Sequence, residues 1–149
     1  MLLKDLCTPD VVSCTPDCSA LHAARLMRQH HVGDLVVIED AETDPSPIGM
    51  VTDRDIVVEV LGRDLDPAKV TLRQIMRKPA VIANVSEDVA QALERMKAHG
   101  VRRIPVVDGG SSLVGILCLD DLLKRLAADA AALVEVISRE QDREHRLRR

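Results

Sequence analysis

The sequence contains no Phe, Tyr or Trp among its 149 residues, although aliphatic and sulfur-containing residues bring the hydrophobic fraction to 46%. Proteins that hold single-stranded nucleic acid by base stacking use aromatic side chains as platforms. That class of nucleic-acid binder is excluded, and any planar ligand must be held between aliphatic side chains. An aliphatic core is still expected, because a chain of about 150 residues buries ~68–70% of its unfolded surface on folding.

The sequence also lacks an excess of positive charge. Its 20 Lys and Arg residues face 24 Asp and Glu residues, giving a formal net charge of −4. This balance argues against a nucleic-acid partner bound through its phosphates. No apolar run approaches the ~20 residues of a membrane span. Residues 1–6 do not resemble a secretory signal, so we expect a cytoplasmic protein with no membrane partner.

Cysteine is scarce, and its spacing fits no common metal site. Three of the four cysteines, Cys7, Cys14 and Cys18, lie near the start, and the fourth is Cys118. No Cys-x-x-Cys or Cys-x-x-His pair occurs, and a disulfide framework would be unusual in such a chain. We expect small buried hydrophobic residues rather than a metal site. A redox sensor built from the first three cysteines is a minor alternative.

The most informative feature is an internal repeat. Residues 27–39 match residues 96–108 at an offset of 69, and residues 48–51 match residues 114–117 at an offset of 66. The first half therefore has a longer loop within residues 40–47, which are rich in Asp, Ser and Pro. Repeats of this kind indicate one structural unit written twice.

Each copy of the repeat predicts the same order of elements. Apolar residues recur at i, i+3, i+4 and i+7 from Ala20 and from Val89, which is typical of an amphipathic helix. Ser86 is the expected N-cap of the second-half helix, and Asp17 or Ser19 that of the first. Two short β-branched strands and another helix follow in each half. Alone, each half would bury too little surface, so the halves must pack together and form clefts between them.

The last helix continues beyond the repeat. Its apolar residues are spaced by three and four positions, and acidic residues precede arginines by four. One interpretation is a seam for a partner helix. The other is a helix that packs on its own domain and ends in a solvated, arginine-rich tail at residues 139–149.

The turn at residues 49–55 is the clearest candidate for ligand binding. Gly49 allows close approach of a backbone or ligand, and Thr52 offers a hydroxyl at the start of a helix. Asp55 could accept hydrogen bonds from a ribose diol. These groups suit a ribonucleotide. They are equally typical of a helix that Thr52 caps and whose dipole Asp53 or Asp55 complements.

Four features occur together: the duplicated unit, the motif Gly49-x-x-Thr52-x-x-Asp55, the run at residues 101–108, and a proline at the start of each half, at residues 9 and 79. Together they resemble a tandem pair of cystathionine β-synthase (CBS) domains, a Bateman module. The resemblance spans about residues 6–127. It implies an α/β fold of two interleaved, pseudo-symmetric β-α-β-β-α units. The expected divisions are a first domain at 6–62, a linker or short helix at 63–75, a second domain at 76–127 and a helical extension at 128–149.

The resemblance also implies a function. Such modules bind AMP, ADP, ATP, NAD or S-adenosylmethionine between their halves, act as regulatory sensors rather than enzymes, and commonly form flat homodimers. Thr52 would then hold phosphate or ribose, and Asp55 the ribose hydroxyls. Asp121 stands at the corresponding place in the second half. There, Cys118 replaces the usual Ser or Thr, and a thiol is a poor donor, so we expect a weaker or empty second cleft.

Further ligand contacts follow from the same resemblance. His30, His31, Arg102 and Arg103 match basic positions that face phosphates, although surface charge or ion pairing would explain them as well. Residues 11–15 and 81–85 would line the base. The predicted ligand-binding residues are Val12, Thr15, His31, Thr52, Arg54, Asp55, Arg102, Arg103, Cys118 and Asp121.

The sequence leaves three functions to consider. The first is a free-standing module that needs no cofactor, binds an adenine-containing regulatory ligand and signals to an effector on another chain. The second is an interaction scaffold whose clefts stay empty. The third, an enzyme, is disfavoured because no nucleophile, base and orienting group are paired by spacing.

Overall fold

The structure is a computed structural model that describes residues 1–148. Residues 1–117 form one compact unit, and a second unit begins at Cys118. The α/β fold contains two three-stranded sheets with strand orders β1-β2-β3 and β4-β5-β6. The predicted order of strand, helix, strand, strand and helix is present in both halves.

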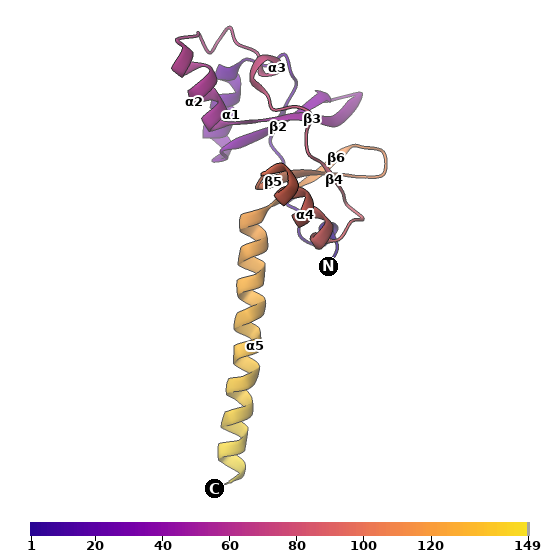
Figure 1. The fold of residues 1–149 in the computed structure, drawn as a ribbon, viewed down its shortest axis with the longest axis vertical. Coiled ribbons are helices and arrows are strands. Elements are labelled where there is room, and N and C mark those ends of the chain that lie inside the picture. The colour runs from indigo at the N-terminus through magenta and orange to yellow at the C-terminus, as the bar shows by residue number, and fades with distance from the viewer. Residues whose placement is uncertain (149) are drawn as a thin grey trace. The chain divides into compact units, whose positions relative to one another are not determined.

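The first half forms the first sheet and its helices (Figure 1). Strand β1 runs parallel to β2, with Cys14 opposite Val37, and β2 runs antiparallel to β3, with Leu35 opposite Val51. Short 3-10 helices occupy Leu3–Asp5 and Leu61–Arg63. In chain order the elements are β1 (Ser13–Cys14), α1 (Ala20–His30), β2 (Asp34–Asp40), β3 (Asp44–Thr52), α2 (Asp53–Glu59) and α3 (Leu72–Ile75).

The second half repeats this arrangement. Strand β4 runs parallel to β5, with Ala83 opposite Val106. The hairpin after β5 is closed where the Asp108 N–H donates to the Ser112 carbonyl at 3.0 Å. The elements are β4 (Ala83–Asn84), α4 (Val89–His99), β5 (Arg103–Val107), β6 (Leu113–Cys118) and α5 (Leu119–Leu147).

The starts of the two long helices of the repeat are capped differently. The Ser19 hydroxyl accepts the His22 N–H at 3.1 Å and begins α1, which confirms one of the two predicted caps. The prediction of Ser86 for α4 is wrong, because Asp88 caps that helix in a reciprocal pair with Gln91. The Ser86 hydroxyl and N–H both donate to the side-chain oxygen of Asn84, which keeps Ser86 in the preceding turn.

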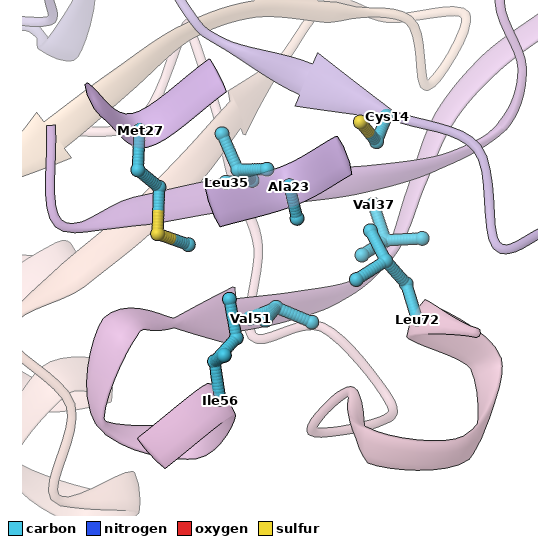
Figure 2. Close-up of a cluster of buried hydrophobic side chains, with 8 residues drawn as sticks. All are labelled: Cys14, Ala23, Met27, Leu35, Val37, Val51, Ile56 and Leu72. Carbon is cyan, nitrogen blue, oxygen red and sulfur yellow. The ribbon is translucent and has the colours of Figure 1, made fainter. Parts of the chain in front are cut away.

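The core of the first half is made of aliphatic and sulfur-containing side chains that converge from helices and strands (Figure 2). Leu35, Val37, Val51 and Leu72 are fully buried. Every position of residues 35–38 is buried, so both faces of β2 are covered, which is typical of an interior strand. The cluster comprises Cys14, Ala23, Met27, Leu35, Val37, Val51, Ile56 and Leu72.

Each half also receives a segment from elsewhere in the chain. The Thr8 N–H donates to Ile116 at 2.9 Å, so the N-terminal segment pairs with β6. The Met50 N–H donates to Arg77 at 3.1 Å, so the segment after α3 pairs with β3. A Cβ on Gly49 would lie 2.9 Å from the Arg77 carbonyl oxygen. Gly49 therefore makes room for a backbone, one of the two roles predicted for it.

The second unit consists largely of α5, a single helix of 29 residues. Leu123, Leu126, Leu133 and Ile137, which belong to the apolar stripe spaced by three and four positions, are more than half exposed. Ion pairs spaced by four residues, such as Arg125 with Asp129, follow the helix surface. The segment predicted as a possible tail is helical as far as Leu147. Within residues 1–148, no helix combines the length and apolarity needed to cross a membrane.

Candidate functional site

A cavity of about 520 Å³ lies within the first unit and is lined by both halves of the repeat. The first half contributes the start of β2, the end of β3 and the first turn of α2. The second half contributes the segment before β4 and the connection from α4 to β5. The volume falls within the range of about 300–1,000 Å³ that is usual for small-molecule sites.

Arginines dominate the polar lining of this cavity. Arg54 and Arg77 come from the chain before the second repeat, and Arg102 and Arg103 from the α4–β5 connection. Asp34 and Asp53 are the acidic residues of the lining. The excess of guanidinium groups makes the cavity suited to an anion, and their planar donor sets match phosphate or carboxylate oxygens.

Thr52 and Asp55 form a reciprocal cap at the start of α2. The Thr52 N–H donates to Asp55 Oδ2 at 2.9 Å, and the Asp55 N–H donates to Thr52 Oγ1 at 3.1 Å. Asp55 is 7% exposed and does not line the cavity, whereas Thr52 does. Its second oxygen, Oδ1, pairs with Arg77. Asp55 thus lies outside the cavity and contacts Arg77, which is one of its lining residues.

Asp34 and Arg103 form an ion pair across the cavity lining. They are separated by 69 residues, which is the offset of the repeat, so they occupy equivalent positions in the two halves. Two residues related by a pseudo-twofold axis can touch only beside that axis. The pair therefore lies beside the axis. An exact repeat would place two side chains of the same charge there, whereas Asp34 and Arg103 carry opposite charges.

The remaining lining is largely apolar. Met50 comes from β3, Pro79, Ala80 and Val81 precede β4, and Val101 follows α4. These side chains can enclose a planar ring between aliphatic faces, and the backbone at residues 79–81 is not part of a named strand. A cavity with apolar walls and a few convergent polar groups is typical of a ligand site.

Comparison with known proteins decides the family. The chain matches the CBS domain family twice, over residues 3–62 and 72–128. It is a tandem CBS domain protein. It is 34% identical to the CBS domain-containing protein YhcV of Bacillus subtilis over 120 residues, which cover 80% of this chain and 81% of YhcV. It is 33% identical over 115 residues to an uncharacterized protein of Methanopyrus kandleri, matching 77% of this chain but 57% of that protein.

Solved structures share the fold. The crystal structure of Hypoxic Response Protein I with two coordinated zinc ions matches with a TM-score of 0.74 and 29% identity, covering 83% of this chain and 98% of that one. The CBS domain pair of MJ0100, in complex with 5′-methylthioadenosine and S-adenosyl-L-methionine, has a TM-score of 0.74 over 87% of this chain and 98% of its own. At 23% identity, that second likeness shows the common fold alone.

The cavity between the CBS domains contains only part of the predicted site. Thr52, Arg54, Arg102 and Arg103 line it together. Val12 instead lines another cavity, of about 650 Å³, beside His30 at the end of α1. Thr15 contacts Cys18, with 3.6 Å between Oγ1 and Sγ.

His31 has a backbone role in the structure. It ends α1 in the left-handed conformation with φ of 54°, and its N–H donates to the Met27 carbonyl. Gly100 does the same at the end of α4 with φ of 61°. The two residues are equivalent in the repeat, and Gly100 rather than His31 lines the cavity between the domains.

Cys118 and Asp121 belong to the second unit. Cys118 precedes α5 without a side-chain capping bond, and Asp121 Oδ1 lies 3.4 Å from Lys124 Nζ one turn along the helix. The first half differs, because there Thr52 and Asp55 cap α2 reciprocally. The expectation of a weaker second cleft stays a prediction.

Sequence reasoning missed Arg77, Asp34 and Asp53. Arg77 lies just before the proline-marked start of the second domain, outside every motif that we assigned to binding. Its equivalent position in the first half carries no such charge. Asp34 could have been found by noticing that the repeat places it opposite Arg103 in sequence alignment, with the charge reversed.

Proposed function

We propose that this CBS pair binds a phosphate-bearing adenosyl ligand in the cavity between its two domains and acts as a regulatory module. The observation that carries the proposal is the convergence of Arg54 and Arg102 from opposite halves on one cavity with aliphatic walls. Phosphates would lie against the arginines, and the base between Val81 and Val101.

The charge of the lining favours AMP, ADP, ATP or NAD over S-adenosylmethionine. The sulfonium centre of S-adenosylmethionine is cationic, and the cavity already holds more arginines than aspartates. Each phosphate would instead gain charge-assisted hydrogen bonds from guanidinium groups. Arg54 is the most available donor, because it makes no ion pair with the residues described, 1–148.

A ligand in this position would couple the two domains. It would touch the first turn of α2 in one half and the α4–β5 connection in the other. Regulation requires that the ligand bind two arrangements of the halves with different affinity. Such a module needs no catalytic group of its own, and its output would pass to an effector on another chain.

The exposed apolar residues of α5 are the proposed surface through which two copies of the chain associate into a homodimer. Replacing Leu126 and Leu133 with Glu should lower the dimer fraction in sedimentation experiments, because the charges would fall within the apolar seam. Ala128→Glu with Ala131→Glu adds the same charge away from that seam and should leave association unchanged. Equal effects of both pairs would contradict an α5 seam.

A thermal-shift panel of AMP, ADP, ATP, NAD and S-adenosylmethionine tests the function. A ligand at 100 times its Kd should stabilise the protein by about 2.7 kcal/mol. For a domain of this size that corresponds to a rise in Tm of roughly 5–10 °C. Absence of any shift at millimolar concentrations of all five compounds would favour the alternative, an interaction scaffold with no ligand.

A further inference from the structure

A second group of functional side chains lies away from the cavity between the domains. Ligand atoms of Cys14, Cys18 and His22 all lie within 4.8 Å of one another. None of the three residues lines that cavity. Among residues 1–148 this is the one cluster of three or more His, Cys, Asp and Glu side chains with such spacing.

Three consecutive backbone elements bring these side chains together. Cys14 ends β1, Cys18 lies in the turn that follows, and His22 is in the first turn of α1. The sequence pattern is Cys-x-x-x-Cys-x-x-x-His, and the spacing of its two cysteines lies within the usual range for zinc ligands. Only the reversal of direction between β1 and α1 makes the three side chains neighbours.

The turn that carries Cys18 is held on both sides by hydrogen bonds. The Cys18 N–H donates to the Thr15 carbonyl at 3.2 Å, and the Cys18 carbonyl accepts the Leu72 N–H of α3 at 2.9 Å. The Pro16 carbonyl accepts the Arg73 N–H at 2.9 Å. The backbone is therefore fixed before any ligand binds, which lowers the entropic cost of ordering a binding site.

We propose that Cys14, Cys18 and His22 bind a thiophilic transition-metal ion, with Zn²⁺ as the favoured occupant. Two thiolates and an imidazole suit Zn²⁺, whereas Mg²⁺ and Ca²⁺ take oxygen ligands. With bonds of about 2.0–2.3 Å, the ligands of tetrahedral zinc lie about 3.3–3.8 Å apart. The side chain of His22 is exposed and free to close the remaining gap by rotation.

The three ligands differ in burial, and this predicts the character of the site. Cys14 is buried in the core cluster, Cys18 is half-buried against it, and His22 faces solvent. A metal ion bound to all three would have its fourth position on the solvent side, open to water or an external ligand. It would also tie β1 to α1 within the first CBS domain.

Metal binding at this position must release protons. Burial, together with the hydrogen bond and charge of Cys18, raises the pKa of the Cys14 thiol to about 12. Zinc is bound by thiolates, so binding at this position releases the protons that the thiols carry in the metal-free protein. Affinity should therefore weaken as the pH falls.

Titration of the reduced, metal-free full chain with Co²⁺ tests the proposal, since thiolate ligation produces characteristic charge-transfer absorption. One Co²⁺ per chain should bind, and Zn²⁺ should displace it. Cys18→Ser and His22→Ala should each weaken binding at least tenfold. The matched controls, Cys118→Ser and His30→Ala, alter a cysteine and an α1 histidine outside the cluster and should bind normally.

Circular dichroism of each variant separates loss of binding from loss of folding. Cys18 and His22 are used because neither is fully buried, unlike Cys14. A folded wild-type chain that gives no charge-transfer band with Co²⁺ would overturn the proposal. So would unchanged affinity in folded Cys18→Ser and His22→Ala, because the metal would then lie elsewhere. The outcome is independent of adenosyl binding, since the two sites share no residue.

Discussion

Asp55 and Arg77 form an ion pair in which Oδ1 of the aspartate lies 3.3 Å from Nη2 of the arginine. The aspartate side chain is 9% exposed, whereas that of the arginine is 69% exposed and lines the cavity between the domains. We therefore expect the carboxylate to act through its partner, as a positioning residue. The resemblance to CBS domains implies that this aspartate holds ribose hydroxyls, which stays a prediction, and in the structure it contacts Thr52 and Arg77.

Replacing Asp55 separates its roles in capping and in positioning. Asp55→Ala should lower the free energy of unfolding by about 1–2 kcal/mol, because α2 loses half of its reciprocal cap. Asp55→Asn keeps an oxygen for the Thr52 N–H, so we expect a smaller loss of stability. Both variants should weaken nucleotide affinity, because Arg77 is no longer held in position by the carboxylate.

Urea unfolding measures the stability of these two variants, and calorimetry measures their nucleotide affinity. Asp121→Ala, the equivalent change in the second domain, is measured beside them. We expect Asp121→Ala to lower nucleotide affinity less than Asp55→Ala does. Loss of binding in Asp121→Ala alone would show that the second cleft is the functional one.

The pair of Asp34 and Arg103 predicts a charge-swap experiment. Asp34→Arg alone or Arg103→Asp alone places like charges beside the pseudo-twofold axis, and each should destabilise the chain. The double swap restores an opposite pair at equivalent positions and should recover part of the loss. The coupling energy from a double-mutant cycle should be about 0.5–3 kcal/mol. Strict additivity of the two single changes in urea unfolding would argue against this ion pair.

Gly49 should tolerate no side chain. A Cβ at this position would lie 2.9 Å from the Arg77 carbonyl oxygen and 3.0 Å from Met76 Sδ. Gly49→Ala must push the segment after α3 away from β3, so we expect a loss of about 1–3 kcal/mol. Gly109→Ala is the matched control, because its Cβ would meet nothing within 4 Å. Equal melting temperatures for the two variants would contradict this packing.

The buried thiol of Cys14 predicts how stability depends on pH in the metal-free protein. Burial raises its pKa from 9.0 to about 12, so the folded chain holds this proton more tightly than the unfolded chain. The stabilisation is fully present below about pH 9 and is lost as the pH rises towards 12.

Reactivity should follow the same direction, because the thiolate is the nucleophile. Alkylation by iodoacetamide at pH 8, followed by peptide mass analysis, should leave Cys14 unmodified in the folded protein and modify it in urea. Rapid labelling of Cys14 in the folded chain would contradict its burial.

Much of the fold could be predicted from local pattern. Apolar residues at helical spacing and short β-branched runs identified the helices and strands, since each is a property of a few adjacent residues. The cap at Ser86 was wrong because the competing side chain of Asn84 holds it in a turn. Which of several nearby capping residues begins a helix depends on such local competition.

The site was less predictable, because its parts come from distant segments. Thr52 and Arg102 belong to recognisable motifs, whereas Arg77 reaches the cavity only through the pairing of its backbone with Met50. Cys14, Cys18 and His22 likewise meet through the turn between β1 and α1, and neither a Cys-x-x-Cys nor a Cys-x-x-His pair signals them. The contacts that complete both sites are tertiary, so residue spacing could not identify them.

If one phosphate-bearing ligand bridges the two CBS domains, calorimetric titration with ATP and AMP should depend on arginines from both halves. Arg54→Ala removes a contact from the first half and Arg102→Ala one from the second. Arg63→Ala is the control, because Arg63 lies outside the cavity and pairs with Glu59 on the surface. We expect saturable binding by the wild-type and control chains and at least tenfold weaker binding by both cavity variants. Wild-type affinity in both cavity variants would contradict it.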